Sequence, residues 1–138
     1  MKPARSAAVV SHLARRLREL ERAAFERLLP RGVTMGDARV VRAVERVGLL
    51  GVSAIAAHLG TSQPAATVAI ARVVAQGLVA QSAHATDGRR KVLILTSRGK
   101  QVDAAHGAVD AQIADGLLSA LPKSARAAAL ELLERLAV

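Results

Sequence analysis

Residues 52–77, VSAIAAHLGTSQPAATVAIARVVAQG, carry the pattern that decides the fold of this chain. Ser53 stands where a side-chain hydroxyl would cap a short helix, and Gly60 follows as the stop signal of that helix. Thr61 or Ser62 is then placed to cap the next helix. The stretch therefore predicts one helix, a three-residue turn and a second helix.

The second helix of this pair has start and stop signals of its own. Pro64 lies in the first turn, where proline is tolerated, and Gly77 marks the end of the helix. Ala56, Gly60 and Ala66 are small where two helices must cross closely and the turn must be tight. That steric demand is typical of a helix-turn-helix.

A β-hairpin is expected directly after these two helices, because the hydrophobic pattern changes there. Residues 78–82 and 91–96 (LVAQS and KVLILT) read as strands, the second rich in β-branched and apolar side chains. Residues 85–88, ATDG, between them have the composition of a turn. A hairpin in this position is a wing, so the sequence predicts a winged helix-turn-helix.

Helices are also expected on both sides of this centre. Residues 7–29 have apolar side chains at steps of three and four, and Thr34 is placed to cap the following helix with Asp37 as its capping-box partner. Thr96 or Ser97 caps a long helix, and Pro122 opens a last one. The fold class expected is mainly α with a small β-hairpin wing. The last two helices carry no basic face and resemble oligomerisation elements.

Composition limits the functions open to the chain. It has 138 residues, 20 Lys and Arg against 11 Asp and Glu, a net charge of +9, no Cys and a single aromatic residue of the Phe, Trp and Tyr class. Without Cys, disulfides and thiolate metal sites are excluded. Stacking of unpaired bases on aromatic rings is disfavoured. No apolar run approaches the roughly 18 residues of a membrane span, and no signal peptide is expected.

The positive charge lies in the first two thirds of the chain. Residues 1–46 carry a net charge of +6, residues 47–100 carry +5 and residues 101–138 carry −2. A basic surface of this kind attracts polyanions, above all nucleic acid. Double-stranded nucleic acid is therefore the expected partner of the helix-turn-helix region, and the acidic C-terminal third is expected to stay away from it.

Four segments give the chain a family resemblance. Residues 33–41 (VTMGDARVV), 52–60 (VSAIAAHLG), 76–79 (QGLV) and 87–96 (DGRRKVLILT), the last followed by Gly99, resemble motifs of the MarR family of bacterial transcriptional regulators. The wing motif is the most specific of the four. The chain departs from the family pattern in its recognition helix, where Val68 and Ala71 replace charged residues, and in its first wing strand.

The resemblance implies one winged helix domain over residues 1–138, with a DNA-binding lobe at about 33–100 and dimerisation helices at 7–29 and 97–138. It implies an obligate homodimer, usually a repressor, that binds a pseudo-palindromic duplex in the bacterial cytoplasm. The resemblance also leaves open a small-molecule effector, whose identity the sequence does not give. No cofactor, metal, catalytic activity or membrane partner is expected.

The recognition helix would enter the major groove with its first residues on base edges. Gln63 can form a bidentate pair with adenine, while alanine and the threonine methyl can touch thymine methyls. In the alternative interpretation, the hydroxyls only cap the helix and the alanines only pack. The candidate contact residues of this helix are Thr61, Ser62, Gln63, Ala65, Ala66 and Thr67.

The wing and the end of the helix supply the basic candidates. Arg89 at the wing tip suits the narrow minor groove, whose negative potential attracts guanidinium, and Asp87 can hold it in place. Arg90 and Lys91 are candidates for phosphate contacts. Arg72 could clamp a phosphate or pair with an acidic residue, and the sequence leaves both open.

Other functions are weaker but remain open. An apolar recognition helix with an exposed Val68 would suit a protein-interaction module, and weak non-specific DNA binding is a further alternative. His12 and His106 on the outer helices could form an interface metal site or pH switch, although ordinary core or surface positions are the default. An enzyme is not expected, because no catalytic constellation or phosphate-binding loop is recognisable.

Overall fold

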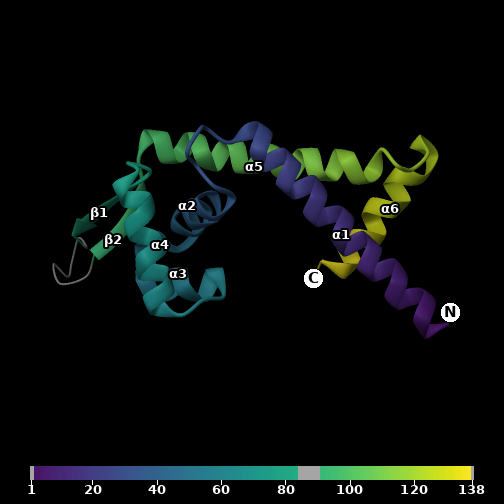
Figure 1. The fold of residues 1–138 in the computed structure, drawn as a ribbon, viewed down its shortest axis with the longest axis horizontal. Coiled ribbons are helices and arrows are strands. Elements are labelled where there is room, and N and C mark those ends of the chain that lie inside the picture. Colours follow the sequence, from purple (N-terminus) through teal and green to yellow (C-terminus); the bar gives the residue numbers. More distant parts are fainter. Residues whose placement is uncertain (1, 84–90, 138) are drawn as a thin grey trace. The chain divides into compact units, whose positions relative to one another are not determined.

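The computed structural model describes residues 2–83 and 91–137 (Figure 1). It divides into two compact units. The winged lobe is Phe25–Ala108, and the helical unit is Met1–Ala24 together with Val109–Val138. The predicted fold class, mainly helical with one two-stranded hairpin, is confirmed. The elements are α1 Pro3–Leu28, α2 Met35–Val47, the 3-10 turn η1 Gly48–Leu50, α3 Val52–Leu59, α4 Gln63–Ala75, β1 Val79–Ala83, β2 Lys91–Leu95, α5 Ser97–Leu118 and α6 Lys123–Leu136.

The start of α2 is fixed by the predicted capping box. The backbone N–H of Asp37 donates to Thr34 Oγ1 at 3.1 Å, and the backbone N–H of Thr34 donates to Asp37 Oδ2 at 3.0 Å. Two N–H groups that the first helical turn leaves unpaired are thereby satisfied.

The start of α3 differs from the expectation. Ser53 does not cap this helix: α3 begins at Val52, and its N-cap is Gly51, which makes no side-chain hydrogen bond. Gly51 has φ +92°, a conformation that glycine adopts without steric cost. With Gly51 as the N-cap, the helix begins at Val52, one residue earlier in the chain than expected. The stop is as predicted, because Gly60 takes the left-handed conformation at φ +68°.

The second helix of the pair starts as the sequence indicates. Ser62 is the N-cap of α4, and its hydroxyl accepts the backbone N–H of Ala65 at 3.3 Å. Pro64 lies in the first turn, where it displaces no hydrogen bond. The predicted tight turn between α3 and α4 is confirmed.

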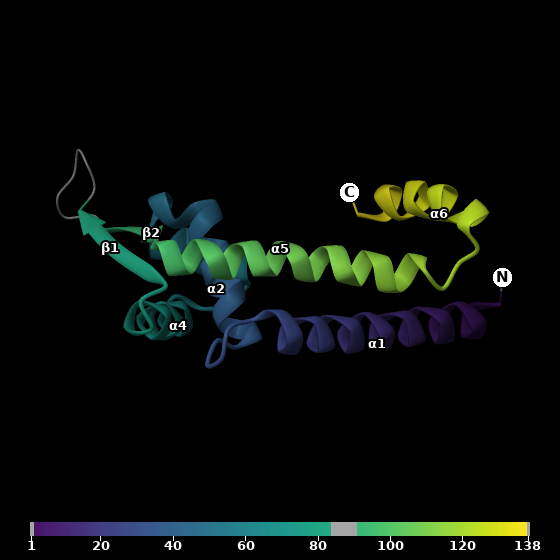
Figure 2. The same ribbon diagram turned by 90° about the horizontal axis from the view of Figure 1, so that it is seen from above.

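The wing follows α4 directly. Strands β1 and β2 pair antiparallel, with Val79 opposite Leu95 and Ala83 opposite Lys91. The first strand therefore ends one residue later than expected, and the predicted turn at residues 85–88 lies outside the described residues. Figure 2 shows β1 leaving the end of α4 and β2 leading into α5.

Hydrogen bonds join the end of α4 to the start of α5. Thr96 caps α5 by accepting the backbone N–H of Gly99 at 3.1 Å, and its hydroxyl donates to the carbonyl of Gly77 at 2.6 Å. Arg98 Nη1 donates to the carbonyl of Gln76 at 2.8 Å. These contacts fix the end of α4 relative to the base of the wing.

The core of the winged lobe is aliphatic. The inward side chains of α2, α3, α4, the wing and α5 interlock, and Leu93 and Leu95 form the inner face of β2. Such burial contributes about 1.5–3 kcal/mol for each large aliphatic side chain. The largest fully buried members are Val41, Ile55, Val73, Leu78 and Val102.

The helical unit is different, because much of its apolar surface is exposed. Val109 is fully buried, and Gly116 lets the Leu20 side chain approach its Cα closely. A groove of about 390 Å³ between leucine side chains is open to solvent. No helix of the described residues is long and apolar enough to cross a bilayer. The exposed large apolar residues of this unit are Val9, Val10, Leu13, Leu121, Leu130, Leu132, Leu133 and Leu136.

Candidate nucleic-acid interface

The first turn of α4 presents most of the predicted contact residues to solvent. Helices α3 and α4 lie one after the other on the winged lobe, and the N-terminus of α4 follows the tight turn at Gly60 (Figure 1). One expectation is corrected: Ala66 is fully buried, so its methyl group packs inside the lobe and cannot reach a base. The exposed members are Thr61, Ser62, Gln63, Ala65 and Thr67.

The hydroxyl groups of this turn are already engaged with the backbone. Ser62 caps α4, as described above, and Thr61 Oγ1 donates to the Ser62 carbonyl at 2.9 Å. Thr67 Oγ1 donates to the carbonyl of Gln63 at 2.9 Å, inside the same helix. Thr67 therefore retains its methyl group and the acceptor side of its oxygen for an outside contact.

The side chain of Gln63 is held by the preceding helix. Its Nε2 donates to Ser53 Oγ at 2.7 Å, and both residues are exposed. Sequence reasoning assigned Ser53 to a cap and so missed this contact. The only sequence signal was the Ser53 hydroxyl at the start of α3, ten residues before Gln63.

An apolar residue occupies the outer face of α4 one turn further on. The Val68 side chain is 72% exposed, and Ala71 is also exposed. On the opposite side of the helix, Ile70 and Val73 are buried in the lobe. The surface that α4 offers is thus polar at its first turn and apolar at its middle.

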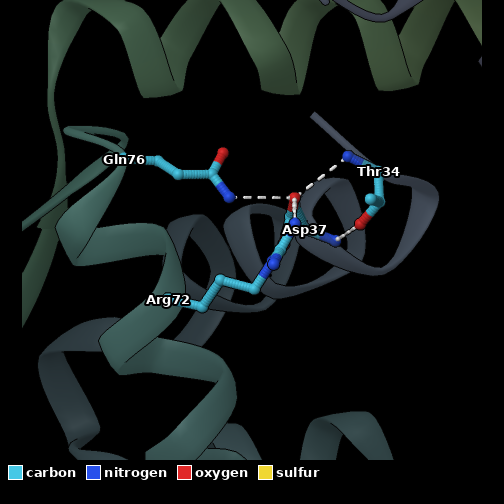
Figure 3. Close-up of polar contacts among 4 residues, drawn as sticks. All are labelled: Thr34, Asp37, Arg72 and Gln76. Carbon is cyan, nitrogen blue, oxygen red and sulfur yellow. Dashed lines mark hydrogen bonds and ion pairs between the residues drawn. The ribbon is translucent and has the colours of Figure 1, made fainter. Parts of the chain in front are cut away.

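Arg72 resolves the alternative that the sequence left open, because it pairs with an acidic residue. Its Nε donates to Asp37 Oδ1 at 2.8 Å and its Nη2 to Asp37 Oδ2 at 3.3 Å (Figure 3). Gln76 Nε2 also donates to Asp37 Oδ2, at 3.1 Å. The Asp37 carboxylate therefore ties α4 to the first turn of α2.

Asp37 is almost fully buried, with 3% of its surface exposed, and it is ionised. Burial by itself raises the pKa of this carboxyl group. Hydrogen bonds from Arg72, Thr34 and Gln76 outweigh burial and lower the pKa from 3.8 to about 2. The same pair raises the pKa of Arg72. The Arg72 side chain is 55% exposed, so one edge of the guanidinium group still faces water.

The wing residues are only partly described. Asp87, Arg89 and Arg90 lie outside the described residues, and the predicted interaction between Asp87 and Arg89 stays a prediction. Lys91 is the first residue of β2 and is exposed, opposite Ala83 of β1. One of the expected cations thus lies exposed at the end of the strand pair farthest from α4 and α5.

The histidine alternative finds no support among the residues that the structure describes. His106 packs edge-on against Phe25, with ring centroids 5.1 Å apart, and its Nδ1 lies 3.4 Å from the carbonyl of Ala38. No group of three or more potential metal ligands comes together within residues 2–83 and 91–137. His106 is therefore a packing residue of the winged lobe.

The comparison with protein families matches the central part of the chain. Residues 31–90 match a model described as the MarR family, and these residues contain both helices of the helix-turn-helix. The resemblance expected from the motifs is thereby confirmed. No curated protein sequence matches the chain.

Solved structures match the fold over nearly the whole chain. The PcaV transcriptional regulator of Streptomyces coelicolor is 24% identical with a TM-score of 0.65, and the match covers 92% of this chain and 93% of that one. A mutant of S. aureus MepR bound to an oligodeoxyribonucleotide is 16% identical, with a TM-score of 0.69 and coverages of 95% and 94%. Bordetella bronchiseptica BpsR, whose DNA binding is regulated by 6-hydroxynicotinic acid, is 24% identical with a TM-score of 0.61 and coverages of 94% and 98%.

Proposed function

We propose that the protein is a DNA-binding transcriptional regulator, because residues 31–90 match the MarR family model and contain the helix-turn-helix. In this proposal it acts as a homodimeric repressor in the bacterial cytoplasm and binds a pseudo-palindromic duplex. Helix α4 enters the major groove, and the wing places Arg89 in the minor groove.

The exposed first turn of α4 is the observation that carries the proposal. The inner side of this helix is anchored in the core by Ala66, Ile70 and Val73, so its outer side is held rigidly at the surface. That outer side begins with Gln63, Ala65 and Thr67, whose groups match adenine edges and thymine methyls. A rigid helix with such a first turn is suited to reading base edges rather than to backbone contact alone.

The cations of the lobe supply the contacts to phosphate. Arg90 and Lys91 follow Arg89 directly in the sequence, and in this proposal both contact the backbone beside the groove that Arg89 enters. Arg72 fixes α4 through Asp37, and the exposed edge of its guanidinium faces a phosphate. Neutralised phosphates release counterions, which makes such binding strong at low salt and weak at high salt.

Dimerisation is assigned to the helical unit. Its exposed leucines and open apolar groove are apolar surface of the kind that protein–protein contacts cover. A second copy of the chain would cover this surface and supply the second recognition helix. With two copies, the half-sites would lie about 34 Å apart, one turn of the duplex. A small-molecule effector, such as the ligand that regulates BpsR, is also part of the proposal, with its identity open.

A protein-interaction module is the second candidate, because Val68 is so exposed. An apolar side chain at the centre of the outer face of α4 would suit a protein surface. In the DNA-binding proposal the same side chain contacts thymine methyl groups in the major groove. Val68→Lys separates the two. In the DNA-binding proposal the added cation should raise the affinity for any duplex while the preference for thymine at the contacted position falls, whereas in the other proposal the variant should weaken binding to an apolar protein surface.

A mobility-shift experiment tests the proposal. The full chain is titrated against duplex DNA from upstream of its own coding sequence and against an unrelated duplex of equal length and composition. We expect the upstream duplex to bind at least about 10³-fold more tightly at physiological salt, as specific sites usually do. Equal affinity for the two duplexes would favour non-specific binding, and binding to neither would exclude the proposal.

A further inference from the structure

The contact between Gln63 and Ser53 gives α4 a specificity device outside the recognition helix itself. We propose that Ser53 is a positioning residue, which orients the Gln63 carboxamide so that it reads adenine. This inference rests on the proposed function, because it needs α4 to face base edges.

The chemistry of the carboxamide permits both contacts at once. A glutamine side chain has two N–H donors and one carbonyl acceptor. One N–H of Gln63 is donated to Ser53 Oγ at 2.7 Å, which leaves the second N–H and Oε1. A bidentate pair with adenine needs just these two groups, one to donate to N7 and one to accept from the N6 amino group.

The hydroxyl of Ser53 is available because α3 does not use it. The N-cap of α3 is Gly51, so the serine stands inside the first turn, and its side chain is exposed. It accepts a hydrogen bond from the side-chain amide of Gln63 on the next helix. The Ser53 side chain, which the sequence predicted to cap α3, instead forms a hydrogen bond with α4.

The attachment point of the Gln63 side chain is fixed as well. Ser62 caps α4 immediately before it, and the Thr67 hydroxyl holds the Gln63 carbonyl at 2.9 Å. An unrestrained glutamine loses considerable rotamer freedom when it pairs with a base, which weakens binding. Because Ser53 restricts the Gln63 amide before DNA binds, part of the side-chain entropy has already been lost in the free protein. The resulting gain in affinity applies only to the base that fits this fixed orientation of the amide.

Selection from a random duplex library tests the inference with the full chain. The wild type is compared with Ser53→Ala, Ser53→Thr and Gln63→Ala, and with Ser124→Ala as a matched control on an exposed serine of α6. The affinity for the selected duplex is then measured against duplexes changed at each adenine. The readout is the ratio between adenine and the other bases at each position, separate from the affinity for the duplex as a whole.

We expect one adenine preference to disappear in Gln63→Ala and to fall roughly two- to tenfold in Ser53→Ala, the loss of about one hydrogen bond. Ser53→Thr, which keeps the hydroxyl, should retain it, and Ser124→Ala should match the wild type. If Gln63→Ala leaves the selected motif unchanged, or Ser53→Ala weakens all duplexes equally, the inference is wrong while the proposed function stands. If the wild type selects no motif, the proposed function itself fails and the inference falls with it.

Discussion

Arg72 in α4 donates two hydrogen bonds to the carboxylate of Asp37, which at the same time completes the capping box of α2. The buried Asp37 carboxylate therefore caps the start of α2 and also forms hydrogen bonds with α4. A guanidinium group matches a carboxylate with two parallel donors, so the pair fixes orientation as well as distance. The pair thus adds a polar contact to the apolar packing of Ala66, Ile70 and Val73 that holds α4 on the lobe.

Asp37→Asn should lower the free energy of unfolding at neutral pH. The folded pKa of about 2 lies below the usual 3.8, so the carboxylate stabilises the fold by about 2 kcal/mol at pH 7. That contribution is complete above the usual pKa and is lost as the pH falls from about 4 towards 2. Urea unfolding at pH 7 and pH 3 should show a smaller difference between wild type and variant at pH 3. Asp115→Asn, at an exposed position of α5, serves as the control.

Arg72→Ala and Asp37→Asn should not be additive. Removing the guanidinium leaves a buried carboxylate with fewer donors, whereas removing both charges leaves no uncompensated ion. The double variant should therefore be more stable than the sum of the single losses predicts, as measured by urea unfolding. Arg72→Lys should not restore full stability, because an ammonium group lacks the fork geometry. Additive losses would mean that the pair contributes nothing of its own.

Gly99→Ala should destabilise the winged lobe by roughly 1–3 kcal/mol, in the range of overpacked core sites. A Cβ there would lie 1.9 Å from the carbonyl oxygen of Leu78, so the backbone at the start of α5 would have to move. Gly107→Ala is the matched control on the same helix, where the nearest atom is 3.9 Å away. It should stabilise the protein by up to about 1 kcal/mol, because alanine favours helix. Thermal unfolding with opposite shifts for the two variants would support this interpretation, and equal shifts would oppose it.

Leu132→Asp should shift the protein from dimer to monomer. The Leu132 side chain is 60% exposed on α6 and lines the apolar groove of the helical unit. A carboxylate placed in a buried interface lacks a partner and disfavours association. Leu49→Asp is the control, since Leu49 is 63% exposed but lies in the winged lobe. Sedimentation velocity should find a monomer only for the first variant, and two monomers or two dimers would contradict the assignment.

Local signals in the sequence were enough to predict most of the fold. The capping box of Thr34 and Asp37, the Ser62 cap and the Gly60 stop each depend on residues within one turn of each other. The hairpin followed from two strands of alternating and β-branched residues, to within one residue at the end of β1. Such features depend on backbone chemistry that neighbouring residues determine.

The missed features depend on contacts between distant residues. Arg72 meets Asp37 across 35 positions and Gln63 meets Ser53 across ten, and only the crossing of the helices decides which donors reach which acceptors. The burial of Ala66 has the same origin. The turn η1 was also missed: Gly48 stands there because the Leu93 carbonyl of β2 would lie 2.3 Å from any Cβ. At these residues, contacts between elements distant in the sequence decide the structure, and local secondary-structure propensity does not.

The salt dependence of duplex binding tests the central claim most directly. Fluorescence anisotropy should measure the affinity of the wild type for its selected duplex and for a scrambled duplex at several salt concentrations. We expect a linear fall of log affinity with log salt concentration, with a slope of about −0.9 per neutralised phosphate, and a large preference for the selected duplex throughout. Arg89→Ala should weaken binding by about 1–3 kcal/mol. A flat salt response with no preference between the duplexes would contradict the account.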